Sequence, residues 1–358
     1  MIDLFSITGP LLRLLDPERA HNTTLRLLET GLAPWSLCPS DPVLRQRLWG
    51  LDFPNPVGMA AGFDKNGQVM APLLGQGFGF VEVGTVTPRP QPGNPQPRCF
   101  RLPEQQAMIN RYGFNSEGHE AVARRLTAYR KRRCKPAGVI GANIGRNKDS
   151  SDAISDYVAG VYTFAPICDY LVINVSSPNT PGLRALQDRA PLTELLSRVL
   201  AARADICEKR PTPVLLKIAP DLTDEDLIAV AEVSLETGID GLIVSNTTIT
   251  RPGLDGVPIA AETGGLSGRP LFKLSTAALA AIYRHTGGKL PLIGVGGIAS
   301  PEDAYAKIRA GASLVQLYTA LVYQGPRLVY EIKRRLPEFL NRDGFKTIAD
   351  AVGADVKL

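Results

Sequence analysis

The sequence predicts an α/β protein, a (β/α)₈ barrel of the TIM type with a small N-terminal helical extension. After residue 40, short apolar runs alternate with helical patterns, which is typical of a parallel sheet covered by helices. Eight such runs have strand length, the number that closes a barrel. A doubly wound open sheet is the alternative, and the number of runs favours the barrel. The expected strands are residues 57–61, 80–84, 139–143, 170–175, 214–218, 241–245, 292–295 and 313–318.

Residues 1–40 lie outside this alternation, and residues 41–358 would form the barrel domain. Apolar residues 11–15, after Thr8-Gly9-Pro10, predict a short helix. Asp16 can cap a second helix with Pro17 at its first position, and Gly31 would end it. The apolar stripe of this helix would comprise Ala20, Thr24, Leu27, Leu28 and Leu32. Such a stripe can pack on the barrel or enter a membrane interface, and packing is the commoner outcome.

Composition excludes several classes of protein. The 358 residues suffice for one large domain with an appendage, and a net charge of +5 suits an anionic ligand or membrane surface better than nucleic acid. Five scattered cysteines predict reduced thiols in a cytosolic setting, and with three histidines no metal centre is expected. We expect neither a secretory signal nor a transmembrane helix, because no cationic leader and no apolar run of about 20 residues is found.

The connection between the second and third expected strands is long. Residues 87–114 are rich in proline, arginine and glutamine, and loops of this length inside a domain are often functional. Its last five residues, Asn110-Arg111-Tyr112-Gly113-Phe114, are typical of a ligand lid. The alternative is a proline-stiffened insertion.

Glycines after the last two expected strands predict a phosphate site. Residues 294–298, Gly-Val-Gly-Gly-Ile, end the seventh strand, and residues 316–319 end the eighth. Glycine lets backbone N–H groups approach a phosphate, and barrels often hold one after strands seven and eight.

Residues 264–268 would add a further backbone nest. Gly75-x-Gly77-x-Gly79 precedes a strand, so it indicates a turn, and a bound phosphate-bearing cofactor is expected instead of free NAD.

Lysines and amides at the strand ends predict what else is bound. Lys65 follows the first strand, and Lys217 lies within an apolar strand, where a buried cation must meet an anion. An amide both donates and accepts hydrogen bonds, so several can read a planar, imide-like ring. These amides are Asn110, Asn143, Asn174, Asn179 and Asn246.

Together these motifs resemble dihydroorotate dehydrogenase of the membrane-associated, quinone-dependent class. The resemblance covers nearly the whole chain, and long matching segments carry it. They are residues 15–21, 60–65, 84–94, 110–114, 174–182, 245–248, 264–270, 294–298 and 314–318.

The resemblance implies oxidation of (S)-dihydroorotate to orotate in pyrimidine biosynthesis, with FMN as the carrier and a membrane quinone, ubiquinone or menaquinone, as acceptor. Ser177 would be the catalytic base at C5 of the substrate, with Phe114 and Thr180 beside the proton path, while a hydride leaves C6. The family's cytosolic class has cysteine at this place. Substrate would be held by Lys65, Asn110, Arg111, Tyr112, Gly113, Phe114, Asn174, Asn179, Asn246 and Thr247.

By the same resemblance, FMN would contact Ala61, Gly62, Thr85, Asn143, Asn174, Lys217, Ser245, Gly268, Gly297, Tyr318 and Thr319. The first 40 residues would form the quinone tunnel, with His21, Arg101 and Tyr318 as its polar residues. For His21 an ordinary cap or core role is the alternative. The chain would be a monomeric bacterial protein, peripheral on the cytoplasmic side of the inner membrane.

Three other functions remain open from the residues. The first is a soluble dihydroorotate dehydrogenase that uses fumarate or NAD. The second is an isomerase or aldolase without flavin, in which Lys217 would form a Schiff base. The third is a non-catalytic membrane-binding barrel. The apolar N-terminal stripe and Ser177 argue against the first, and the density of polar strand ends argues against the third.

Overall fold

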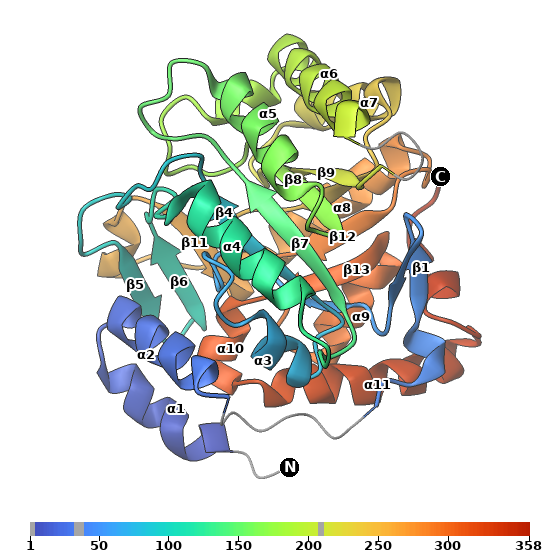
Figure 1. Cartoon of the computed structure of the whole chain (residues 1–358). Helices are drawn as coiled ribbons and strands as arrows, with labels where there is room; N and C mark the ends of the chain where they lie inside the picture. Colours follow the sequence, from blue (N-terminus) through green and yellow to red (C-terminus); the bar gives the residue numbers. More distant parts are fainter. Residues whose placement is uncertain (1–3, 32–38, 207–210) are drawn as a thin grey trace.

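A closed barrel of parallel strands forms the centre of the computed structural model, as the sequence predicts (Figure 1). The structure describes residues 4–31, 39–206 and 211–358. Neighbouring strands follow one another along the chain until the last pairs with the first, Val315 lying beside Val57. The strands are β3 (Val57–Met59), β4 (Phe80–Val86), β7 (Val139–Ile144), β8 (Tyr170–Asn174), β9 (Val214–Ile218), β10 (Gly241–Val244), β12 (Leu292–Val295) and β13 (Ala312–Leu317).

Helices surround the barrel and bury its outer face (Figure 1). They are α3 (Met70–Gly75), α4 (Gly118–Arg130), α5 (Ala153–Phe164), α6 (Arg189–Ile206), α7 (Asp224–Thr237), α8 (Phe272–His285), α9 (Pro301–Arg309), α10 (Thr319–Gln324) and α11 (Arg327–Asp343). Short 3₁₀ turns lie at Pro42–Leu44, Arg184–Gln187, Pro258–Ala261, Arg269–Leu271 and Ala349–Ala351.

Aromatic side chains fill the barrel near the amino ends of its strands. Phe80 and Tyr170 point inward, and the hairpin of β1 (Gln46–Leu48) and β2 (Leu51–Phe53) adds Phe53, whose ring centroid is 5.5 Å from that of Phe80. Room for these rings comes from glycine. A Cβ on Gly58 would lie 2.2 Å from the Phe80 ring, and one on Gly141 would lie 2.1 Å from the Tyr170 ring. The closed end leaves the opposite mouth for ligands.

The long connection after β4 is more ordered than the sequence indicates. It contains β5 (Cys99–Leu102) and β6 (Ala107–Asn110), which pair with β11 (Gly265–Gly268) in an antiparallel sheet. The prediction of a backbone nest at residues 264–268 was therefore wrong, since Gly265–Gly268 is a strand. Residues 110–114 leave the end of β6, and Gly75–Gly79 forms the expected turn.

Two helices precede the barrel, α1 (Leu4–Leu14) and α2 (Pro17–Glu29). The first begins well before the predicted start and continues through Pro10. The second matches the prediction: the Asp16 side chain accepts from the backbone N–H groups of residues 18 and 19, and Gly31 follows with φ +73°.

The predicted apolar stripe of α2 is only partly correct. Ala20 and Leu28 are buried, but so is Leu25, which the stripe omitted, and Leu27 is 54% exposed. Leu32 lies outside the described residues. On α1, Ile7, Leu11 and Leu14 are exposed as well. No helix in the described part of the chain is long and apolar enough to cross a bilayer.

We predict that Gly141→Ala destabilises the barrel by about 1–3 kcal/mol, because the new methyl group meets the Tyr170 ring in a closely packed interior. Gly344→Ala is the control. A Cβ added at Gly344 would meet no atom within 4 Å, so this substitution only places alanine in a left-handed backbone conformation at φ +79°, which costs about 1 kcal/mol. Thermal unfolding of both variants measures the difference, and equal midpoints would contradict the packing argument.

Candidate functional site

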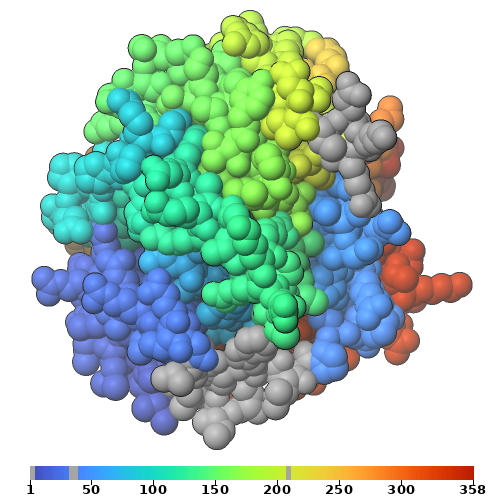
Figure 2. All heavy atoms as spheres, in the orientation of Figure 1, coloured from blue at the N-terminus to red at the C-terminus, as the bar shows by residue number. Residues whose placement is uncertain are grey.

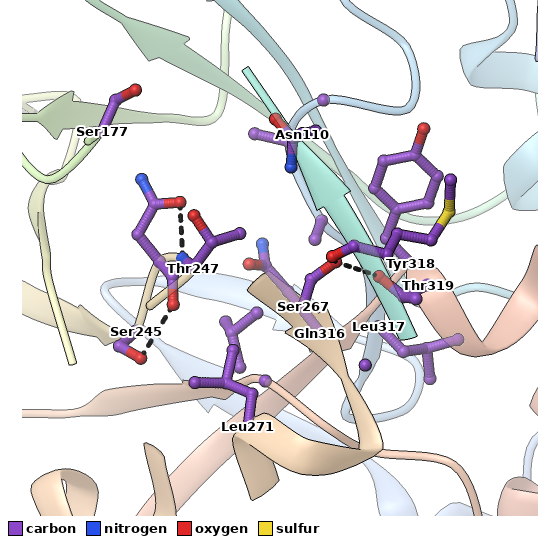
Figure 3. A pocket seen from close by; sticks show the side chains of 18 of the residues that line it. Asn110, Ser177, Ser245, Thr247, Ser267, Leu271, Gln316, Leu317, Tyr318 and Thr319 are labelled. Atoms are coloured by element: carbon purple, nitrogen blue, oxygen red, sulfur yellow. Dashed lines mark hydrogen bonds between the residues drawn. The ribbon is translucent and has the colours of Figure 1, made fainter. Parts of the chain in front are cut away.

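A cavity opens at the carboxyl ends of the barrel strands, the end at which such barrels bind ligands. The space within it and its mouth is about 1340 Å³. Ends of β8, β9, β10, β12 and β13 line it, and the sheet of β5, β6 and β11 covers one side. In Figure 3, Ser177 lies on one side of the cavity, and Tyr318 and Thr319 lie on the other.

Most residues predicted to bind the cofactor or substrate meet in this cavity. They are Ala61, Gly62, Lys65, Thr85, Asn110, Tyr112, Gly113, Phe114, Asn174, Ser177, Asn179, Lys217, Ser245, Asn246, Thr247, Gly268, Gly297, Tyr318 and Thr319.

Two other predicted residues, Asn143 and Arg111, do not line the cavity. Asn143 is fully buried and reaches the cavity through Thr85 and Asn174. Arg111 turns outward to Glu262, 2.6 Å away, and stacks on Phe100. Thr180, expected beside the proton path, is buried behind the lining too.

A buried carboxylate, Glu82, organises the floor of the cavity. Its two oxygens accept hydrogen bonds from Asn143 Nδ2 at 2.7 Å and from Gln316 Nε2 at 2.6 Å. Lys217 Nζ lies 3.7 Å from Glu82 Oε1, so the lysine that the sequence places in a strand has its counterion inside the barrel. Alternate residues of a strand face the same side, which is why Phe80 and Glu82 of β4 both point into the barrel.

The amides continue this network toward the mouth. Asn174 Nδ2 donates to Thr85 Oγ1 at 2.9 Å and to Asn143 Oδ1 at 3.1 Å, and Asn174 Oδ1 accepts from Ser176 Oγ at 2.9 Å. Asn246 Nδ2 donates to Ser176 Oγ at 3.0 Å. Side chains from four strands are thereby held in one orientation.

The same network separates the two serines after β8. Ser176 is fully buried, and its hydroxyl is engaged with Asn174 and Asn246. Ser177 lines the cavity, and its Oγ accepts a hydrogen bond from Asn179 N at 3.2 Å. Because Ser177 Oγ is the acceptor in that bond, the Ser177 hydroxyl remains able to donate its proton to a ligand.

Lys65 and Tyr112 form a polar wall beside the lid. Lys65 Nζ donates to Gly62 O at 2.7 Å and lies 4.4 Å from the centre of the Tyr112 ring. Burial lowers the pKa of Lys65 to about 8. An anionic ligand would raise the pKa of Lys65 again, because an opposite charge favours the charged form of an amine.

The glycine-rich side of the cavity fits a phosphate-bearing group. Gly296 and Gly297 both have positive φ, +107° and +77°, and follow β12. The hydroxyls of Ser267 and Thr319 are hydrogen-bonded to each other at 2.9 Å, as the dashed line in Figure 3 shows. Gln316 Oε1 is a buried acceptor without a partner in the described residues. A flat ligand with an imide N–H would satisfy it.

Tyr318 connects the cavity to the N-terminal helices. Its hydroxyl lies 3.4 Å from His21 Nδ1, and Phe63 packs edge-on against both rings, with centroids 5.4 Å from His21 and 5.5 Å from Tyr318. Burial, with the nearby Lys65 charge, lowers the pKa of His21 to about 3. Arg101 donates to the carbonyls of Arg13, within α1, and of Leu15, just after it, and its buried Nε has no partner among the described residues.

Sequence reasoning missed Glu82, Gln316 and Ser267. Glu82 could have been found, because it is a charge inside an apolar strand, the same signal that selected Lys217. Gln316 carries a similar signal. The sequence marks residues 264–268 only for their backbone. Nothing local marks the Ser267 side chain, because β11 pairs with β6, more than 150 positions away.

The chain is similar throughout to known proteins. The family model described as dihydroorotate dehydrogenase matches residues 43–340. "Dihydroorotate dehydrogenase (quinone)" of Parvibaculum lavamentivorans is 60% identical over 357 residues, covering all of both chains. The Azorhizobium caulinodans protein of the same name is 56% identical, covering 99% of this chain and 100% of the relative. Among solved structures, ligand-free DHODH from Eimeria tenella is 45% identical with a TM-score of 0.92, covering 96% of this chain and 100% of that one.

We predict that Glu82→Gln destabilises the protein by about 3–5 kcal/mol. The substitution leaves Lys217 as a buried charge without its counterion and turns an amide N–H₂ toward other donors. Exposed Glu104→Gln is the matched control and should be neutral. Denaturant unfolding measures both, and a stable Glu82→Gln variant would remove Glu82 from its central role.

We predict that acid weakens the contact of α2 with the barrel through His21. Because its folded pKa is about 3 and its unfolded pKa is 6.5, the unfolded chain binds more protons in this window. Stability should therefore fall as the pH drops from 6.5 toward 3, by at most about 1.4 kcal/mol per pH unit. His21→Gln, which cannot titrate, should flatten the profile of unfolding free energy. Parallel profiles for the two proteins would contradict this assignment.

Proposed function

The chain belongs to the dihydroorotate dehydrogenase family, and on that premise we propose that it oxidises dihydroorotate to orotate in pyrimidine biosynthesis and passes the electrons to a quinone. The observation that supports this most is the meeting of Ser177, four asparagines, Lys65 and a glycine-rich phosphate side in one cavity. Relatives at 50–60% identity carry the name "dihydroorotate dehydrogenase (quinone)", which supports a quinone as the electron acceptor.

Enzymes of this family are flavoproteins, and we assign FMN as the flavin. When bound, FMN would supply an acceptor for the hydride that leaves C6 of the substrate and a source of two electrons for the quinone. Lys217 would place positive charge beside the ring where negative charge develops, and Glu82 would hold the ammonium there. The N–H groups near Gly296 and Gly297, with Gly268 and Thr319, would bind the phosphate.

Substrate would lie between the lid and the polar strand ends. Asn110, Asn174, Asn179 and Asn246 would pair with the imide edge of the ring, and Lys65 would face the carboxylate. Ser177 is proposed as the base that removes the C5 proton. As it accepts the C5 proton, Ser177 would pass its own hydroxyl proton out along the expected path beside Phe114 and Thr180.

Quinone would enter beside α1 and α2, where His21 and Tyr318 meet and where Ile7, Leu11 and Leu14 are exposed. These apolar side chains suit a lipid surface, so we propose residues 1–40 as the quinone-tunnel segment and a peripheral place on the cytoplasmic side of a bacterial inner membrane. We propose a monomer, as the sequence suggested.

The alternatives fit the site less well. A fumarate- or NAD-linked enzyme would have no use for the exposed apolar face of α1. An aldolase would need Lys217 as a free nucleophile, whereas its ammonium faces the Glu82 carboxylate.

The experiment that tests the function is an anaerobic absorbance spectrum of the purified protein. Dihydroorotate should bleach a flavin band, and a short-chain quinone should restore it while fumarate and NAD do not. A colourless protein would overturn the flavin assignment, and recovery with NAD or fumarate would overturn the quinone.

We predict that Ser177→Ala keeps the flavin but slows its reduction by dihydroorotate about 10²–10⁴-fold, the usual contribution of a positioned base. Anaerobic stopped-flow absorbance measures the rate. Ser197→Ala, on the exposed face of α6, is the control. Reduction at the wild-type rate in Ser177→Ala would exclude this serine as the base.

A further inference from the structure

One guanidinium joins the N-terminal helices to the substrate lid. Arg98 precedes β5, and its Nε and Nη2 donate to the two carboxylate oxygens of Glu18 on α2, at 3.0 and 2.6 Å. The Arg98 side chain is buried, 8% exposed, and the Glu18 side chain is 13% exposed. A bidentate arginine–carboxylate pair fixes distance and orientation, and breaking such a pair when buried is costly.

The remaining contacts of Arg98 point toward the substrate side. Its Nη1 donates to the carbonyls of Pro92 and Asn94, at 2.6 and 2.8 Å. Its guanidinium also lies 5.3 Å from the centre of the Tyr112 ring, the ring that Lys65 contacts from 4.4 Å. Arg98 therefore holds the turn at residues 92–94 and the lid aromatic together.

Asn94 carries this contact into the lid and the catalytic loop. Its backbone N–H donates to Tyr112 O at 2.9 Å, and its Nδ2 donates to Arg111 O at 3.0 Å and to Asn179 O at 3.3 Å. Asn179 in turn donates from Nδ2 to Asn110 O at 3.2 Å. Glycine makes the approach close, because a Cβ on Gly113 would lie 2.6 Å from Asn94 Nδ2.

The helix that carries Glu18 also carries His21, one turn later, at the Tyr318 side of the cavity. In Figure 2 the deep-blue surface of α1 and α2 lies directly against the cyan surface of the segment that precedes β5. The same helix thus contacts both the expected quinone entry and, through Arg98, the lid.

We infer that Glu18 and Arg98 are positioning residues of the dihydroorotate site, so that the N-terminal segment shapes substrate binding as well as quinone access. Glu18 fixes the position of the Arg98 guanidinium, and Arg98 in turn fixes the turn at residues 92–94. That turn orients residues 110–114 and Asn179 over the substrate. The inference rests on the proposed function. The inference goes beyond the proposed function because it gives the first 40 residues a part in the first half-reaction, the oxidation of dihydroorotate.

Two measurements on the holoenzyme test this inference. The first is the Kd for orotate, monitored by the shift of the flavin spectrum. The second is the rate of anaerobic flavin reduction at varied dihydroorotate concentration, without quinone. Glu18→Gln should raise the orotate Kd and the dihydroorotate concentration for half-maximal reduction about tenfold, with a smaller change in the limiting rate. Arg98→Lys should do the same, because an ammonium keeps the pair with Glu18 but cannot also reach two carbonyls. The double variant should be little worse than the worse single variant, since both act through one contact.

Exposed residues supply the controls. Arg19→Gln removes a charge next to Glu18 on the same helix, and Glu104→Gln removes one from the turn between β5 and β6. Both should leave the orotate Kd unchanged. If Glu18→Gln and Arg98→Lys lower the melting temperature but leave the orotate Kd at the wild-type value, the pair only supports the fold and the inference is overturned.

A measurement on the wild-type protein covers the case in which the variants do not fold. Coupling between sites is reciprocal, so orotate should slow amide hydrogen exchange in α2, residues 17–29. Unchanged exchange in α2 would overturn the inference. Failure of the proposed function would look different, because the wild-type flavin would then show no response to orotate or dihydroorotate.

Discussion

The Glu82 carboxylate inside the barrel is the constraint on which the rest of the site depends. A charge in this interior is stable only with partners, and Asn143, Gln316 and Lys217 supply them. Each partner comes from a different strand, so satisfying one carboxylate aligns three strand ends. Asn174 is aligned in turn by Asn143. The polar groups that face a ligand are therefore fixed from below before any ligand arrives.

The barrel gives this network a direction. Phe53, Phe80 and Tyr170 close the amino ends of the strands, where glycines admit their rings. Polar side chains are then gathered toward the open mouth, where they find hydrogen-bond partners or a ligand. The mouth has two sides. Ser177 and the asparagines form one, and Tyr318 with His21 forms the other, which suits a reaction with two successive partners.

Particular residues show why some predictions succeeded and others did not. All eight barrel strands were predicted because strands buried on both faces are continuous apolar runs. Strand β11 was missed because its partner β6 lies more than 150 positions away in the sequence. Strands β5 and β6 form a local hairpin, but they lie inside the polar connection that was interpreted as a loop. The start of α1 was misjudged at Pro10, where packing against α10 overrides the intrinsic preference of proline. The exposure of Leu27 also depends on tertiary packing.

The sequence by itself predicted the barrel and the cavity at its carboxyl end, because strand order and side-chain alternation bring the strand ends to one mouth. The resemblance to the family supplied most of the residues that line the cavity. Only the tertiary structure decided which polar groups are partners. Asn143 lies behind the lining, Ser176 is engaged while Ser177 is accessible, and Arg98 joins Glu18 across 80 residues of chain. Such pairings depend on distances between segments far apart in sequence, which no local pattern of residues records.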